Sequence, residues 1–255
     1  MKLLQSFMIA FSMYSKIPVP RVTWTEENMK YALCFFPLVG VVTGSCVWLA
    51  GSLLLRSGCG RLFYAVIMTL VPVVISGGIH LDGFMDTIDA LSSYGDREKK
   101  LAILNDPHAG SFAVLGICCY FLLTAAFWGE TTVGMLPVIA GGYVLSRAMS
   151  GFAVVIFPAA KQSGLARTFQ EGANRQHTGM VMVLCALAAG GFMLYASPLT
   201  AVAAIAGAVI VLVYYRLMAM RQFGGITGDL AGYFLQLCEL AILIGTVLAG
   251  GGLWN

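Results

Sequence analysis

Long uninterrupted stretches of apolar residues dominate the chain, and short clusters of charged and polar residues separate them. Uncharged runs occupy residues 31–55, 62–79 and 109–129, and a fourth run at 131–160 is broken only by Arg147. A helix needs about 20 apolar residues to cross a bilayer. Each of these four runs is therefore predicted to form a transmembrane helix.

The second half of the chain continues this pattern. The run at 178–215 contains Ser197-Pro198 near its middle, which predicts two spans joined by a tight turn. The last run, 230–255, is broken only by Glu239. The pattern predicts an all-α fold, a polytopic membrane helical bundle of about seven transmembrane helices that forms a single domain over residues 1–255.

The N-terminal stretch has a different character. Apolar side chains recur at helical spacing from Leu3 to Tyr14, but this stretch is too short to span a bilayer, which predicts an interfacial helix. Ile17-Pro18-Val19-Pro20 ends it, because proline removes a backbone donor. Thr23 or Thr25 is predicted to cap the next helix, whose first turn is acidic.

The composition and the placement of charge support this topology. Hydrophobic residues make up 59% and charged residues 11% of the 255 residues, which excludes an ordinary soluble domain. If the seven predicted spans cross the membrane one after another, twelve of the fifteen Lys and Arg residues lie on the same side of the membrane as the N-terminus. The positive-inside rule then predicts a multi-pass protein of the cell membrane with a cytoplasmic N-terminus. Its three longer connections, 80–108, 158–177 and 216–229, would all face the cytoplasm.

The most informative polar stretch follows the second apolar run. Asp82, Asp86 and Asp89 are three of only twelve acidic residues, and their spacing places them within about 60° of one another on a helix. Like charges at this spacing repel unless a cation holds them, and Mg²⁺ prefers carboxylate oxygens. We therefore predict that these three residues bind Mg²⁺. The alternative is a solvated acidic helix start that complements the helix dipole.

Further candidates lie in the other cytoplasmic connections and within the spans. Glycines around Asp229 would let the backbone approach a ligand closely, and this aspartate joins the first three as a candidate catalytic residue. Arg147 and Glu239 are expected at similar depth in the membrane, where they would form an ion pair. The candidate substrate-binding residues are His80, Asp106, His108, Arg147, Lys161, Arg167, Thr227 and Glu239.

Several of these motifs, in this order, resemble the cobalamin synthase family, whose members are adenosylcobinamide-GDP ribazoletransferases. The resemblance rests on Gly78-Ile79-His80-Leu81-Asp82-Gly83 with Asp86 and Asp89, on Asp106 with Gly110, on Thr227-Gly228-Asp229, on Ser146-Arg147 and on the Ile17–Pro20 segment. The chain departs from the usual family pattern at Ser15-Lys16 and Pro107-His108, and near Gln236, where the family often has a second acid. The aspartates of the pattern are all present.

The resemblance implies an integral membrane, Mg²⁺-dependent transferase of the last step of cobalamin nucleotide-loop assembly. Its substrates would be adenosylcobinamide-GDP and α-ribazole or α-ribazole 5′-phosphate, and GMP would leave. A metal at Asp82 and Asp86 would bridge pyrophosphate oxygens, and Asp89 or Asp229 would accept the hydroxyl proton.

Other readings of the acidic helix remain open. They are a CDP-alcohol phosphotransferase, a membrane prenyltransferase and, in a different class, a cation transporter. The spacing of the aspartates does not match the wider array of the first, and no internal repeat typical of the last is visible. The chain carries no nucleic-acid-binding motif, its lipid partner is the bilayer, and the sequence leaves homo-oligomerisation open.

Overall fold

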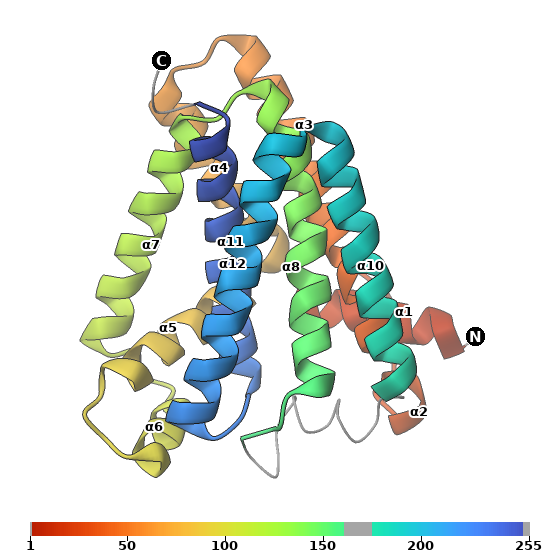
Figure 1. Cartoon of the computed structure of the whole chain (residues 1–255). Coiled ribbons are helices and arrows are strands. Elements are labelled where there is room, and N and C mark those ends of the chain that lie inside the picture. The colour runs from red at the N-terminus through yellow and green to blue at the C-terminus, as the bar shows by residue number, and fades with distance from the viewer. Residues whose placement is uncertain (1, 161–174, 252–255) are drawn as a thin grey trace.

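The computed structural model is a bundle of long helices that describes residues 2–160 and 175–251 (Figure 1). Within these ranges the only extended pairing is an isolated bridge between Ala159 and Ile226. The helices are α1 (Lys2–Tyr14), α2 (Glu26–Met29), η1 (Ala32–Phe35), α3 (Phe36–Ser57), α4 (Arg61–Ser76), α5 (Ile79–Ser92), α6 (Arg97–Ile103), α7 (Ser111–Gly129), η2 (Val133–Met135), α8 (Leu136–Ile156), α10 (Arg175–Ala196), α11 (Pro198–Met218), η3 (Ala219–Phe223) and α12 (Gly228–Ala249).

The number of helices that can cross a membrane agrees with the sequence pattern. Six described helical segments are long and apolar enough to do so, and α4 with α5 would supply a seventh as a broken span. The outer surfaces of these helices carry many exposed large apolar side chains, as lipid-facing surfaces do. The predicted all-α membrane bundle of about seven spans is confirmed.

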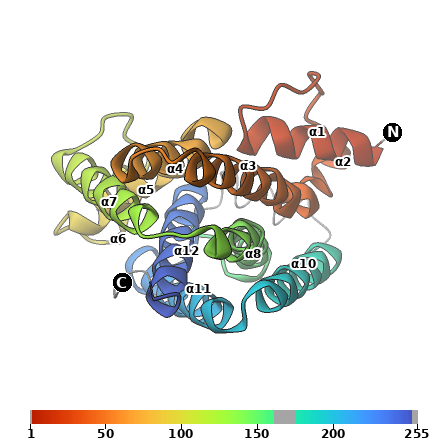
Figure 2. The same cartoon turned by 90° about the horizontal axis from the view of Figure 1, so that it is seen from above.

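The helix α8 lies at the centre of the bundle together with α12. Seen from above, α3, α4, α7, α11 and α10 surround this central pair (Figure 2). Helix α8 is buried along most of its length, whereas α7 and α10 expose most of theirs. Gly40 and Gly44 lie directly against the α8 backbone, where a Cβ atom would collide with it. These glycines allow the close helix packing that small residues provide in membranes.

The second apolar run does not continue as a straight helix into the acidic stretch. Helix α4 ends at Ser76, and the axis of α5 is bent by 99° from that of α4. Gly77 and Gly78 form this joint with φ angles of +67° and +81°, a left-handed conformation that glycine adopts without a steric penalty. The acidic helix therefore runs across the end of the bundle (Figure 1).

The N-terminal segment supports this joint. The backbone N–H of Lys16 donates to the carbonyl of Ile75 over 2.8 Å, and the Lys16 side chain covers Gly77 so closely that no Cβ atom would fit there. Helix α1 packs on α2 and η1 and leaves Leu3 and Leu4 exposed. Its position at the membrane interface remains a prediction.

Two sequence-based expectations about helix ends can be checked directly. Asn28 N–H donates to Thr25 Oγ1 over 3.3 Å, so Thr25 is the residue that caps α2. The turn at Ser197-Pro198 separates α10 from α11, as the interrupted apolar run predicted.

The described parts of the three longer connections meet at the end of the bundle that carries α1 and α5 (Figure 1). Ala160 N–H donates to the carbonyl of Ile226, and Ile226 N–H donates to the carbonyl of Pro158. Lys100 on α6 is buried and donates to Gln222 Oε1 over 2.6 Å. Arg97 also reaches the carbonyl of Ala160. These bonds tie residues from all three connections to one another.

Candidate functional site

The candidate site forms where the acidic helix α5 crosses the start of α12. A Cβ atom added to Gly83 would lie 2.7 Å from the carbonyl oxygen of Asp229, and one added to Gly232 would lie 3.0 Å from the carbonyl oxygen of His80. The two glycines thus allow the helix backbones to touch. This contact brings Asp229 beside the acidic face of α5, although the two lie far apart in the chain.

The aspartates of this crossing act on one another electrostatically. Partial burial raises the pKa of Asp86 to about 6, and the carboxylates of Asp82, Asp229 and Asp89 contribute to this shift in that order. Asp82 is exposed, and Asp86 and Asp89 are partly buried. The four carboxylates therefore form one negatively charged group, which would be stabilised by a cation.

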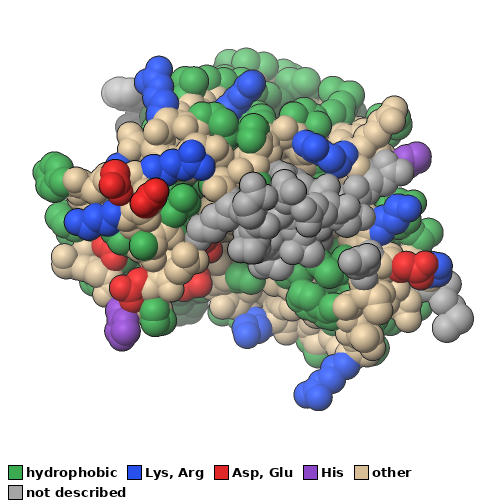
Figure 3. All heavy atoms as spheres, turned by 90° about the horizontal axis from the view of Figure 1, so that it is seen from below, with side chains coloured by type: hydrophobic (Ala, Val, Ile, Leu, Met, Phe, Trp, Pro, Cys, Tyr) green, Lys and Arg blue, Asp and Glu red, His purple; other side chains and the backbone are tan. Residues whose placement is uncertain are grey.

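The end of the molecule that carries this group is shown from below in Figure 3. Most of the acidic side chains visible on this face gather on one side of it, and Lys and Arg side chains are spread over the whole face, including that side. An anionic substrate with a bound divalent cation would meet both signs of charge at this surface.

The donor set of the site fits Mg²⁺ only in combination with a further ligand. Within the described ranges, no three His, Cys, Asp or Glu side chains are placed so that they alone could hold a metal ion. Mg²⁺ is usually bound by one or two carboxylates together with water and substrate phosphates. The accessible Asp82 and the partly buried Asp86 match that mode of binding. The magnesium assignment remains a prediction.

Asp89 has a structural partner that the sequence did not suggest. Its two carboxylate oxygens accept the backbone N–H groups of Gly110 and Ala113 over 2.5 and 3.0 Å. Asp89 therefore caps the N-terminus of α7 from another helix, and a side chain at position 110 would collide with it. Its predicted roles in metal binding and catalysis are untested.

The glycines in the connection before α12 pack against other segments of the protein. Gly225 lies directly against the backbone of residues 158–160, and Gly224 lies beneath the guanidinium group of Arg97. Thr227 caps α12 by accepting the N–H of Leu230 over 3.2 Å. These glycines were expected to let the backbone approach a ligand, and in the structure they let it approach neighbouring segments. Thr227 has a structural role as the cap of α12.

Asp106 and His108 lie in the exposed turn before α7. The N–H and the ring Nδ1 of His108 both bond to Asp106 Oδ1, at 2.9 and 2.8 Å, and the backbone bond is the main cause of the lowered pKa of Asp106. Both residues are exposed at this turn, and their predicted contact with substrate is untested. Two other candidates, Lys161 and Arg167, lie outside the described residues.

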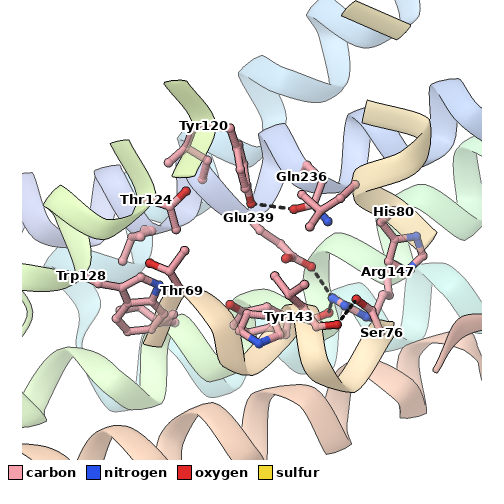
Figure 4. Close-up of a pocket in the computed structure, with 16 residues that line it drawn as sticks. Thr69, Ser76, His80, Tyr120, Thr124, Trp128, Tyr143, Arg147, Gln236 and Glu239 are labelled. Atoms are coloured by element: carbon pink, nitrogen blue, oxygen red, sulfur yellow. Dashed lines mark hydrogen bonds and ion pairs between the residues drawn. The ribbon is translucent and has the colours of Figure 1, made fainter. Parts of the chain in front are cut away.

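The predicted ion pair within the spans is confirmed. Arg147 Nη1 lies 2.5 Å from Glu239 Oε1, and the two side chains are only 2% and 8% exposed. Arg147 also donates to the carbonyl of Tyr143. Both charges lie between α8 and α12 (Figure 4), whereas the helix α5, which carries three of the four carboxylates, lies at the end of the bundle (Figure 1). Their predicted contact with substrate remains untested.

His80 and Gln236 complete the polar interior near this pair. His80 is 6% exposed and packs against the rings of Tyr14 and Phe36, with centroid distances of 6.1 and 5.9 Å. Gln236 accepts a 2.6 Å hydrogen bond from the Tyr120 hydroxyl. Gln236 was noted only as a departure from the family pattern and not predicted as a site residue, although its position three residues before Glu239 places it on the same helical face.

The comparisons with known proteins agree on one family. A family model described as cobalamin-5-phosphate synthase matches residues 6–247. An adenosylcobinamide-GDP ribazoletransferase of Lachnoclostridium phytofermentans is 44% identical over 251 residues, which cover 98% of this chain and 96% of the relative. Proteins of the same name from Clostridium perfringens (strain 13 / Type A) and Pseudomonas putida (strain KT2440) are each 32% identical, over 94% and 95% of this chain and 96% and 98% of the relatives. No solved structure matches the chain.

Proposed function

The chain belongs to the cobalamin-5-phosphate synthase family, and from this membership we propose how its residues carry out the reaction of an adenosylcobinamide-GDP ribazoletransferase. The protein is a membrane transferase of cobalamin biosynthesis that performs the final nucleotide-loop assembly step. We take adenosylcobinamide-GDP as one substrate and α-ribazole, or its 5′-phosphate, as the other. The observation that supports this reaction is the group of four carboxylates at the crossing of α5 and α12.

The reaction joins a ribose hydroxyl of the ribazole to the phosphorus that bears the cobinamide arm. The hydroxyl oxygen forms a new bond to this phosphorus, the bond to the bridging oxygen of the pyrophosphate breaks, and GMP leaves with that oxygen. The hydroxyl proton passes to a base. Such phosphoryl transfers depend mainly on positioning and on neutralisation of charge.

The carboxylates divide these tasks according to their surroundings. Asp82 and Asp86 would hold Mg²⁺, which supplies positive charge at the pyrophosphate oxygens and at the leaving phosphate. Asp89 is bonded through both oxygens to the start of α7, so we assign it to orientation of that helix. Asp229 lies at the helix crossing beside Asp86, and we assign to it the acceptance of the hydroxyl proton.

The active face is proposed to be cytoplasmic. The carboxylate group lies at the end of the bundle that carries α1, and the last helix ends at the opposite end (Figure 1). The excess of Lys and Arg on the connections at this end supports the same orientation. Phosphorylated substrates would then reach the site from the cytoplasm without crossing the bilayer.

A GMP-release assay tests this proposal. Purified protein in liposomes receives adenosylcobinamide-GDP, α-ribazole and Mg²⁺, and GMP and the joined corrinoid are quantified. Loss of a carboxylate ligand removes charge stabilisation worth several kcal/mol, so we expect Asp82→Asn and Asp86→Asn each to lower turnover by orders of magnitude. Glu98→Gln on α6 is the matched control, because Glu98 is an exposed carboxylate outside the group.

Two outcomes would contradict the proposal. Near-normal turnover of Asp82→Asn at saturating Mg²⁺ would exclude this carboxylate as a metal ligand. Wild-type protein that transports a cation across the liposome membrane but releases no GMP would instead support the transporter reading.

A further inference from the structure

A small polar cavity lies inside the bundle, at the inner side of the joint between α4 and α5 (Figure 4). Its volume is about 30 Å³, and residues of α4, α5, α7, α8 and α12 line it. The polar lining includes Ser76, His80, Tyr120, Tyr143, Arg147 and Glu239. A cavity with this lining is unusual in the middle of a membrane protein, where charged and polar groups are costly.

The unsatisfied polar atoms of the molecule concentrate at this cavity. Among the described residues, four buried side-chain polar atoms lack a hydrogen-bond partner. Three of them, His80 Nε2, Arg147 Nε and Thr124 Oγ1, belong to residues that line the cavity. The fourth, the Tyr215 hydroxyl, lies elsewhere. Buried polar groups are nearly always hydrogen-bonded, so three such atoms around one cavity indicate a missing partner.

We propose that this cavity is a binding site for one or two structural water molecules. A bound water needs about 10–15 Å³ and two to four polar partners, and the cavity offers both. Truly empty cavities in proteins are lined by apolar groups, which is not the case here. Water donating to or accepting from His80 Nε2 and Arg147 Nε would complete the hydrogen bonding of both side chains.

Other occupants fit less well. The volume is too small for an organic ligand. A metal cation would be repelled by the guanidinium group of Arg147. The carboxylate of Glu239, which could offset this repulsion, is already paired with Arg147. An anion would meet the carboxylate of Glu239. A neutral molecule that both donates and accepts hydrogen bonds matches this mixed lining.

The bound water would connect the start of the acidic helix to the centre of the bundle. His80 lies two residues before Asp82, and its outer side is held by the rings of Tyr14 and Phe36. His80 lines the cavity together with Arg147, and its Nε2 atom is buried without a hydrogen-bond partner. We therefore assign His80 as a positioning residue, which acts through water to hold the first turn of α5. This assignment rests on the proposed function of Asp82 and Asp86.

Radiolytic footprinting tests the water site without any assay of activity. X-ray pulses generate hydroxyl radicals from water next to a side chain, so the full-length protein in nanodiscs is irradiated and oxidised tyrosines are identified by mass spectrometry. Tyr143 and Tyr120 line the cavity and are 5% and 8% exposed. Tyr233 is the control, because it does not line the cavity, is 7% exposed, and has a hydroxyl bonded to that of Tyr214. We expect oxidation of the first two at a rate well above that of Tyr233. Equal rates at all three positions would overturn the water site.

Two variants sharpen this measurement. Thr124→Val removes one polar atom of the lining with little change in volume and keeps the buried charges. The combined substitution Arg147→Met and Glu239→Met removes both charges and leaves an apolar wall. We expect oxidation of Tyr143 to fall in Thr124→Val and to reach the rate of Tyr233 in the double variant. Unchanged oxidation of Tyr143 in a folded variant of either kind would contradict the site.

The positioning role of His80 has a separate readout. We expect His80→Leu to remain folded and to need about tenfold more Mg²⁺ for half-maximal GMP release. Loss of a residue that orients a metal ligand typically weakens metal binding by this amount. A lower maximal rate at an unchanged Mg²⁺ requirement would show that His80 is only structural. Absence of GMP release by the wild-type protein would contradict the proposed function instead, and the footprinting result would still decide the water site.

Discussion

The contact between Gly83 on α5 and the start of α12 leads to a sharp prediction about activity. In Gly83→Ala the new methyl carbon would lie 2.7 Å from the carbonyl oxygen and 2.8 Å from the Cα atom of Asp229. Both neighbours are backbone atoms, so no side-chain rotation can relieve the overlap. The two helices must therefore move apart.

The size of this movement follows from the distances. Ordinary van der Waals contact begins at 3.4 Å, so the new methyl group lacks about 0.7 Å of space. Overpacking of this kind costs about 1–3 kcal/mol of unfolding free energy. A displacement near 1 Å at a reacting centre lowers rates by roughly a hundredfold. We expect Gly83→Ala to lower kcat by about 10- to 100-fold, because Asp229 moves away from Asp82 and Asp86.

Two further glycine variants provide the matched series. Gly232→Ala meets the carbonyl oxygen of His80 at 3.0 Å, a smaller overlap, and Gly191→Ala on α10 meets nothing within 4 Å. We expect the loss of GMP release to decrease in that order, with Gly191→Ala close to wild type. Thermal unfolding in detergent shows how much of each loss reflects folding. Activity of Gly83→Ala equal to that of Gly191→Ala would refute the role of the helix crossing.

The other predictions concern the ion pair, the α7 cap and the topology. Breaking the buried pair with Glu239→Gln should cost about 3–5 kcal/mol and lower folded yield, whereas Arg147→Met with Glu239→Met should restore part of that yield; additive effects of the two single substitutions would exclude pairing. Asp89→Ala should lower the unfolding free energy by about 0.5–2 kcal/mol, seen as a lower melting temperature, because α7 loses its cap. A cysteine at position 96, on a background without native cysteines, should react with a membrane-impermeant reagent only from the cytoplasmic side, and labelling from outside alone would contradict the topology.

Features that repeat along the chain were predictable from the sequence. The thickness of the bilayer is fixed, so apolar runs of sufficient length identify the spans, and the six long helices with the α4–α5 pair agree with them. The spacing of Asp82, Asp86 and Asp89 placed them on one helix, which is observed as α5. The equal depth of Arg147 and Glu239 was sufficient to predict their pairing.

The geometry of the joint was not predictable in the same way. Gly77-Gly78 permits a helix end, but the 99° bend depends on where α5 finds a packing surface, and Lys16 from the N-terminal segment covers the joint. Two adjacent glycines allow many backbone angles, and only contacts with distant segments select one of them.

The sequence by itself determined the membrane bundle, the acidic helical face and the buried ion pair, because each depends on local composition or on a helical period. Tertiary structure alone decided which carboxylates meet. It placed Asp229 beside α5 through the contact of two glycines, and it turned Asp89 toward the amides of α7. The physical reason is that a helix crossing depends on how well two helix surfaces fit together. The sequence shows where a glycine permits close contact, but not which segment it will contact.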